Sequence, residues 1–159
     1  MELDEYDRQL LNIVQEDSDQ TAERMAEQIP LSPSAIQRRL RRLREDGVIT
    51  RYAAILDPAK IGKPTHFVVS VHVERERPEH LAQFRAWLAA QPHVQQAFYV
   101  TGEADFVLVI TAPDTETYDR LMASLVNDNL NVKRFTTNVA LNVVKTGLSI
   151  PVPPVSGEA

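Results

Sequence analysis

The sequence predicts an α+β protein of two modules: three short helices, followed by an antiparallel sheet with two helices. In the first 45 residues, apolar side chains recur every three or four positions, which is the spacing of amphipathic helices. After residue 64, β-branched runs alternate with helical stretches in the order βαββαβ, the ferredoxin-like arrangement. The chain has 159 residues, of which 43% are hydrophobic, so it can form one ordinary domain or two small ones.

The first module is predicted to contain three amphipathic helices with short connections. The first covers residues 3–16 and the second residues 21–29. The third begins after Ser32, which can cap a helix, and Pro33, which suits the first helical position because its missing N–H is not needed there. It ends before Gly47, a residue type that readily adopts the left-handed conformation just past a helix end.

The third helix combines a narrow apolar stripe with a dense group of arginines. Ile36, Leu40 and Leu43 fall within about 60° of one another around the helix axis. The segment 31–52 contains six arginines against two acidic residues, a local charge of +4, which leaves −9 for the rest of a chain whose net charge is −5. A basic block on an acidic chain indicates one module that binds a polyanion, usually DNA, joined to a module with another task.

The order helix, helix, short turn, basic helix is that of a helix-turn-helix unit, whose last helix enters the major groove. We expect the start of this helix to read base edges and the remainder to hold phosphates. The predicted base-reading residues are Ser34, Ala35, Gln37 and Arg38, with Ala35 near a thymine methyl. The predicted phosphate contacts are Ser32, Arg41 and Arg42. For Arg39 and Arg44 we expect local ion pairs with Glu45 or Asp46. The alternative is a solvated basic face on an ordinary surface helix.

The remaining elements define the predicted domain boundaries. Residues 48–56 are β-branched and apolar and predict a strand leaving the helix-turn-helix. The boundaries are then 1–56 for the winged-helix-like DNA-binding domain, 57–64 for a hinge, 65–146 for the ferredoxin-like domain and 147–159 for a disordered tail rich in proline. Within the second domain, strands are expected at 66–73, 94–100, 105–112 and 132–144, with helices from Pro78 to Gln91 and from Pro113 onward.

Several function classes are not supported by the residues. Without cysteine, disulfides, thiolate metal sites and cysteine nucleophiles are excluded. His66 and His72 share one face of a strand but have no further ligands in the pattern, so we expect no metal site, no cofactor and no catalytic residues. The acidic N-terminus is unlike a signal peptide and no apolar run is long enough to span a bilayer, so a cytoplasmic location is expected.

One set of residues, distributed over both modules, carries a family resemblance: Leu3-Asp4, Asp7, Leu10-Leu11, Leu31-Ser32, Arg38-Arg39-Leu40, Leu43, Gly47-Val48-Ile49, Leu56-Asp57-Pro58, Gly102 and Asp105. In these residues the sequence resembles the Lrp/AsnC family of feast/famine transcription regulators. The resemblance implies a regulator with a helix-turn-helix and an effector-binding domain often called RAM, homodimers that assemble further, commonly to octamers, and effectors that are amino acids or related metabolites bound between dimers near the β-hairpin loop. One departure is Pro30, where the family commonly has glycine. Proline excludes a left-handed residue from that turn.

The effector site is predicted around the hairpin that follows residue 99. The candidate residues are Tyr99, Thr101, Gly102, Asp105, Thr136, Thr137 and Asn138. Gly102 lets a ligand carboxylate approach backbone N–H groups, and the Asp105 carboxylate can accept from an α-ammonium group. The alternative is structural: Gly102 only permits the turn and Asp105 caps it.

Two other functions are weighed against an effector-responsive regulator. One is an enzyme of the sirohaem decarboxylase type, which resembles this family and has lost DNA binding. The other is a ligand-sensing scaffold that does not bind DNA. The arginine-dense third helix favours the regulator over the enzyme, and titration with a non-specific duplex at two salt concentrations would separate the regulator from the other two functions. Apolar side chains on both faces of the strands at 67–71 and 106–110 further predict a two-fold dimer, because one face packs under the helices and the other needs a partner sheet.

Overall fold

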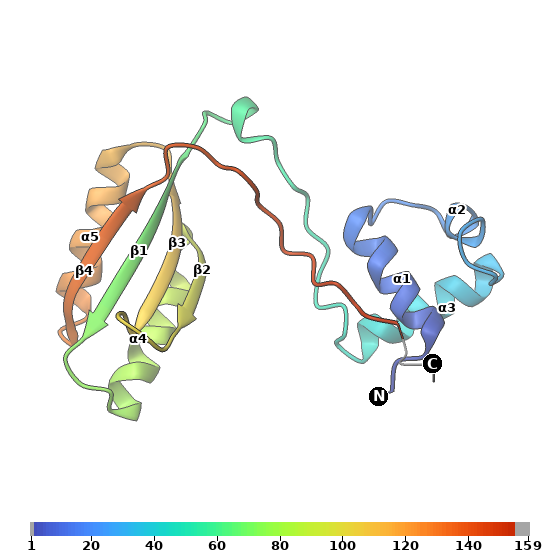
Figure 1. Ribbon diagram of the computed structural model, residues 1–159, viewed down its shortest axis with the longest axis horizontal. Coiled ribbons are helices and arrows are strands. Elements are labelled where there is room, and N and C mark those ends of the chain that lie inside the picture. The colour runs from blue at the N-terminus through green and yellow to red at the C-terminus, as the bar shows by residue number, and fades with distance from the viewer. Residues whose placement is uncertain (1, 155–159) are drawn as a thin grey trace. The chain divides into compact units, whose positions relative to one another are not determined.

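The computed structural model describes residues 2–154, which form two compact units (Figure 1). The N-terminal unit contains residues 2–55 together with the C-terminal segment from residue 146. The sheet unit is Leu56–Lys145. The division after Ile55 lies one residue from the predicted boundary, whereas the predicted tail belongs to the N-terminal unit instead of standing alone.

Three helices form the N-terminal unit: α1 (Glu5–Glu16), α2 (Ala22–Ala26) and α3 (Pro33–Glu45). Asp4, Thr21 and Ser32 cap them, each accepting a hydrogen bond from the backbone N–H three residues on. The caps predicted at Thr21 and Ser32 are therefore confirmed. The helices enclose a small core, whose fully or nearly fully buried members are Leu10, Val14, Ala22, Met25, Ile29 and Ile36.

The turn chemistry around α3 follows the sequence closely. Gly47 has φ +73°, the left-handed conformation expected just past the helix. The residues between α2 and α3 contain no positive φ, and at position 30 the proline ring itself excludes one. The strand predicted at residues 48–56 is wrong, because the structure has no strand there and leaves residues 51–56 exposed. β-branched residues favour a strand only where a neighbouring strand supplies hydrogen bonds, and the described part of this chain offers none.

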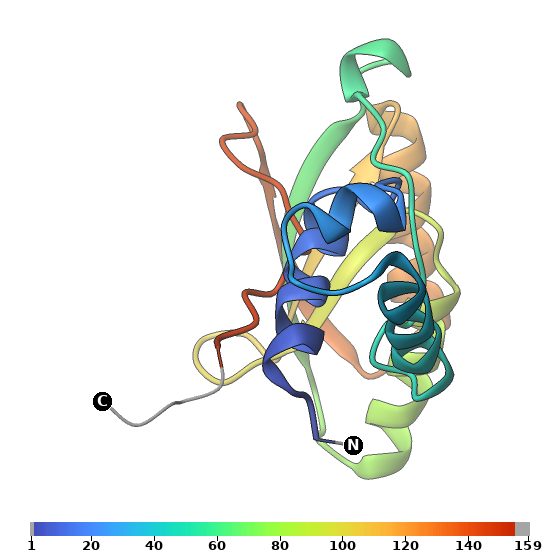
Figure 2. The ribbon, with the colours of Figure 1, turned by 90° about the vertical axis from the view of Figure 1, so that its right-hand side faces the viewer.

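A four-stranded antiparallel sheet organises the second unit (Figure 1, Figure 2). Its elements are β1 (Thr65–Val73), α4 (Pro78–Ala90), β2 (Val94–Tyr99), β3 (Phe106–Ala112), α5 (Thr115–Asp128) and β4 (Val132–Val139). The strand order β2-β3-β1-β4 confirms the predicted ferredoxin-like fold. The last strand ends at Val139, short of the predicted Val144, because Phe67, near the start of β1, already pairs with Val139.

The two faces of the sheet differ in burial. Phe67, Val69 and Val71 of β1 are at most 2% exposed and pack with α4 and α5. The alternate residue Val68 points to the opposite face, where it is 38% exposed, and Phe98 of β2 on that face is 50% exposed. The described chain therefore covers one face of its sheet and leaves an apolar second face open.

The described part of the tail belongs to the N-terminal unit. Residues 150–153 run along α1 and hydrogen-bond to its side chains (Figure 1). Residues 155–159 of the predicted tail lie outside the described residues. None of the helices between residues 2 and 154 is long and apolar enough to cross a membrane.

Candidate nucleic-acid interface and ligand site

Helix α3 presents most of the predicted DNA contacts to solvent. Ile36 and Leu43 are fully buried and hold the helix on the core. Among the predicted DNA contacts, only Ala35 is partly buried. The others are exposed: Ser32, Ser34, Gln37, Arg38, Arg41 and Arg42. Ser32 Oγ lies 3.2 Å from Ser34 Oγ and also caps the helix at Ala35 N–H. The exposed helix start can therefore offer hydroxyl, amide and guanidinium groups to a nucleic acid.

A buried carboxylate on α1 holds two of the arginines. Asp7 is fully buried, and its side-chain oxygens accept from Arg39 Nη1 at 2.8 Å and from Arg42 Nη2 at 2.5 Å. Arg39 Nη1 also donates to Asp4 Oδ2 at 2.6 Å, and its guanidinium lies 5.6 Å from the centre of the Tyr6 ring. An isolated buried carboxylate is costly, so these charge-assisted bonds are what make Asp7 tolerable at this position.

The same network shifts the pKa values of Asp4 and Arg39. Burial raises the pKa of Asp4, but hydrogen bonds from the Asp7 backbone N–H and the Arg39 side chain outweigh it and leave that pKa below its usual value. The hydrogen bond to Asp4 raises the pKa of Arg39, which keeps its charge fixed. Asp4 and Asp7 further cap α1 reciprocally, each accepting from the other's backbone N–H. The charges thus lock the start of α1 to the middle of α3.

This network corrects the predicted roles of the arginines. Arg39 does not pair with Glu45 or Asp46 but with two aspartates about 35 positions earlier in the chain. Arg42 pairs with Asp7 while its side chain stays 46% exposed, so its position on α3 is held from within the unit. Neither Arg38 nor Arg41 has an ion pair within residues 2–154, and both are exposed. Arg44 is also exposed and has no ion pair within the same range, so its expected pairing with Glu45 or Asp46 is wrong.

Sequence reasoning did not predict the buried ion pairs of Asp7, although a signal was present. On a helical wheel Asp7 lies about 60° or less from Leu3 and Leu10, at the edge of the apolar stripe of α1. An acidic residue placed on a buried stripe indicates a buried ion pair. Its partners lie far away in sequence, so only the fold identifies them.

At the hairpin between β2 and β3, Asp105 has a structural role. Its Oδ2 accepts from the Val73 N–H at 2.8 Å, where the β1–β4 register shifts. Its backbone N–H donates to Val71 O, and its carbonyl accepts from Val100 N–H. Gly102 has φ +121°, which L-residues rarely adopt, so glycine is needed for the turn itself. Thr101 and Gly102 are exposed at the tip.

The other predicted effector residues are divided between the two faces of the sheet. Tyr99 pairs with buried Phe106, and its hydroxyl donates to Glu76 Oε2 at 2.6 Å; that bond, chiefly, raises the pKa of Tyr99. Thr137 meets the Tyr118 hydroxyl under α5. Thr136 and Asn138 alternate with Thr137 and are exposed on the open face. One copy of the chain therefore does not gather the seven residues around one ligand.

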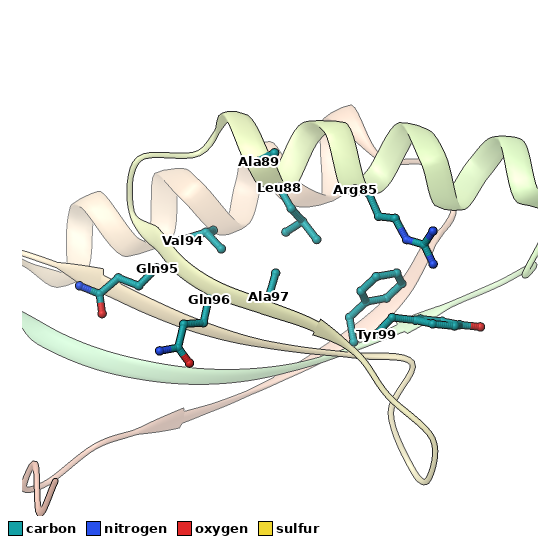
Figure 3. A pocket seen from close by; sticks show the side chains of 9 residues that line it. Arg85, Leu88, Ala89, Val94, Gln95, Gln96, Ala97 and Tyr99 are labelled. Carbon is teal, nitrogen blue, oxygen red and sulfur yellow. The ribbon is translucent and has the colours of Figure 1, made fainter. Parts of the chain in front are cut away.

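Sequence reasoning missed a shallow hollow between α4 and β2 (Figure 3). Arg85, Gln95 and Gln96 contribute its polar groups, and Leu88 and Val94 part of its apolar wall. The Arg85 guanidinium extends from α4 toward Tyr99 and lies 5.3 Å from the centre of its ring. Tyr99 alone among the predicted effector residues borders this hollow. Among residues 2–154, no three His, Asp or Glu side chains are grouped to hold a metal ion.

Two family models match the chain in the order in which the two units follow each other. Residues 3–50 match a winged helix-turn-helix DNA-binding model, and residues 66–150 match the Lrp/AsnC ligand binding domain. The chain belongs to the Lrp/AsnC family. The expected family membership, the α+β fold and the helix-turn-helix are thereby confirmed.

Relatives of this Lrp/AsnC protein are similar over nearly their whole length. An HTH-type transcriptional regulator of Sinorhizobium fredii, y4tD, is 40% identical, covering 96% of this chain and 90% of its own. The DNA-binding transcriptional activator DecR of Escherichia coli is 29% identical, covering 94% and 99%. These relatives are regulators and not enzymes, which favours the predicted regulator over a decarboxylase.

Solved structures agree with the two-unit fold. An AsnC family transcriptional regulator from Agrobacterium tumefaciens superposes with a TM-score of 0.84 at 28% identity, covering 93% of this chain and 96% of that one. The Neisseria meningitidis regulator NMB0573, in complex with L-Met, gives 0.83 at 27% identity, covering 94% and 97%. The chain is thus a DNA-binding transcription regulator that also carries a ligand-binding domain.

Proposed function

We propose that this regulator binds specific DNA as a homodimer, and that an amino acid or a related small metabolite controls its DNA binding or its assembly. The observation that carries the proposal is the exposed basic surface of α3, with Arg38 and Arg41 unpaired among the described residues, on a chain that also has a ligand-binding domain. Such a protein acts where the chromosomal DNA is, in the cytoplasm.

The exposed positions along α3 support a division of labour among its residues. Ser34, Ala35, Gln37 and Arg38 lie at the start of the helix, the part of a recognition helix that reaches base edges. We expect Ser32 and Arg41 to hold phosphates. Arg42 can add a phosphate contact through the guanidinium N–H groups that do not bind Asp7. Non-specific attraction to phosphates then gives DNA binding a steep dependence on salt.

The open face of the sheet supports the homodimer. Val68, Phe98, Val107 and Val109 share this face by strand register, and the first two are well exposed. An apolar sheet face in water favours a second copy, and two recognition helices suit a two-part DNA site. Light scattering at micromolar concentration should give at least twice the chain mass of 17.9 kDa, with octamers as the expected larger form. A monomer mass would contradict the dimer.

The effector site is proposed at the hairpin, completed by another copy. Thr136 and Asn138 on the open face, with Thr101 and Gly102 at the exposed turn, offer hydrogen-bonding groups that no other element of the described chain covers. The other three candidates stabilise the sheet around this site through hydrogen bonds within the chain: Tyr99, Asp105 and Thr137. Because the Neisseria regulator was solved in complex with L-Met, methionine is the first ligand to test.

A thermal-shift screen of the twenty amino acids tests this proposal directly. A ligand present at 100 times its Kd stabilises the folded state by about 2.7 kcal/mol. We expect one or a few amino acids to raise the melting temperature and to change the affinity for a cognate duplex. If a ligand shifts melting while the protein binds no duplex at low salt, the chain is a sensing scaffold and not a DNA-binding regulator.

A further inference from the structure

Three side chains of α1 hydrogen-bond to the backbone of residues 150–153. Asn12 Nδ2 donates to Val152 O and Asn12 Oδ1 accepts from Val152 N–H, both at 3.0 Å. Gln15 repeats the pattern on Ile150, with Nε2 donating at 2.9 Å and Oε1 accepting at 2.7 Å. Arg8 Nη1 adds a bond to Pro153 O at 3.0 Å. Two side-chain amides thus each satisfy both the N–H and the carbonyl of one peptide residue.

The spacing of the three side chains matches an extended chain. Arg8, Asn12 and Gln15 fall within about 60° around the helix axis, on the side opposite the buried Leu10 and Val14. From Arg8 to Gln15 the helix rises about 10.5 Å, and residues 150–153 in extended form span about 9–10 Å in the reverse direction. The peptide therefore runs antiparallel to α1 with each contact in reach of its partner.

The sequence of the tail prepares it for this binding. Ile150 and Val152 each precede a proline, which biases them toward extended conformations before they bind. Prolines 151 and 153 have restricted φ and no N–H, so the only N–H groups between residues 150 and 153 are the two that α1 accepts. Val152 is partly buried, whereas its two proline neighbours are exposed. Ordering this segment costs less conformational entropy than ordering a flexible tail.

We propose that α1 is a docking surface for an extended peptide, and that its occupant is residues 150–153 of the same chain, which thereby tie the two units together a second time. The hinge after Ile55 joins the units at one point. The docked tail, reached through residues 140–149, joins them again. Two connections restrict the orientations of the N-terminal unit more than one does. Building on the proposed function, a change at the ligand-binding sheet then reaches the recognition helix through both connections.

Amide hydrogen exchange in the full-length protein tests the docking. In wild type, we expect Ile150 and Val152 amides to exchange at least tenfold more slowly than in a free peptide of residues 147–154. The double variant Asn12→Leu/Gln15→Leu keeps helix propensity but removes both amides, and should abolish the protection. Glu16→Leu, an exposed change on the same helix, is the matched control and should preserve it. Free-peptide rates in wild type, or protection that survives in the double variant, would overturn the docking.

A mixing experiment identifies the chain that supplies the tail. Isotope-labelled double variant is mixed and equilibrated with an excess of unlabelled wild type. Its labelled tail should remain unprotected if docking is within one chain. Regained protection would mean that the tail reaches the partner's α1, and would overturn the same-chain assignment.

The absence of cysteine allows a direct test of the second connection. Spin labels at Glu23→Cys and Gln95→Cys report the distance between the two units, with excess unlabelled protein added to suppress signals between copies. We expect the distance distribution to be at least twice as wide in the Asn12→Leu/Gln15→Leu background as in the control. Equal widths would overturn the restraint. Because this readout needs neither DNA nor ligand, its failure is distinguishable from failure of the proposed regulation.

Discussion

The recognition helix and the β2–β3 hairpin were both predicted as binding sites, but their candidate side chains differ in how many already have partners within the chain. On α3, most predicted contacts point to solvent, and the buried stripe faces the core. At the hairpin, Asp105 and Tyr99 already have partners in the same chain, and Thr137 lies under α5. A helix fixes the direction of each side chain by its position, whereas a hairpin residue can serve the turn or a ligand with the same chemistry.

The largest expected effect concerns the buried carboxylate that holds α3. Asp7→Ala leaves Arg39 without its buried partner and removes half of the α1 capping box, so the free energy of unfolding should fall by about 3 kcal/mol or more. Urea unfolding followed by circular dichroism measures the change. Glu16→Ala, an exposed acidic position on the same helix, should change stability by less than about 0.5 kcal/mol. Equal small losses would mean that the network contributes little to the unit.

The next effect concerns DNA specificity at the start of α3. Arg38→Ala should weaken binding to a cognate duplex by roughly 1–3 kcal/mol and relax the preference at one base pair. Stability should stay within about 0.5 kcal/mol, because Arg38 has no ion pair in the described chain. Fluorescence anisotropy with cognate and random duplexes distinguishes a base contact from a phosphate contact. A loss of the same size on both duplexes would assign Arg38 to phosphates.

A smaller effect separates structure from ligand binding at Asp105. Asp105→Ala leaves the Val73 N–H without its acceptor and should cost about 1–2 kcal/mol of stability without any ligand. Asp105→Asn keeps a neutral acceptor oxygen and should recover most of that loss. Thermal melts of both variants, with and without the effector found by screening, make the comparison. If Asp105→Ala melts like wild type but no longer responds to the effector, the carboxylate is a ligand contact.

The smallest effect is the pH dependence from Asp4. Its folded-state pKa is lowered, so the ionised carboxylate stabilises the fold above its unfolded-state pKa, and that contribution disappears as the pH falls through the lowered folded-state value. Since Asp4 is half exposed, solvent screening keeps the contribution under about 1 kcal/mol. Asp4→Asn retains a good cap and should flatten the acid limb of the stability curve. An unchanged acid limb would assign that dependence to other carboxylates.

Periodicity and capping residues sufficed to predict most of the fold. Ser32, Pro33 and Gly47 bounded α3 correctly, and the succession of strands and helices along the chain predicted the ferredoxin-like fold. The failures have one physical cause, which is dependence on partners distant in sequence. Residues 48–56 resemble a strand but have no strand to pair with in the described chain. The partners of Arg39 lie at the start of α1, and residues 150–153 lie along α1 because Asn12 and Gln15 hydrogen-bond to their backbone.

The central claim is that the arginines of α3 divide into those that hold the helix and those that meet DNA. Measuring the salt dependence of DNA binding and the free energy of unfolding for Arg41→Ala and Arg39→Ala tests it most directly. Arg41→Ala should flatten the slope of log K against log salt by about one unit with stability within about 0.5 kcal/mol of wild type. Arg39→Ala should lose about 2 kcal/mol or more of stability and leave the slope of the folded protein unchanged. Identical changes in the two variants, in slope and in stability, would contradict the division.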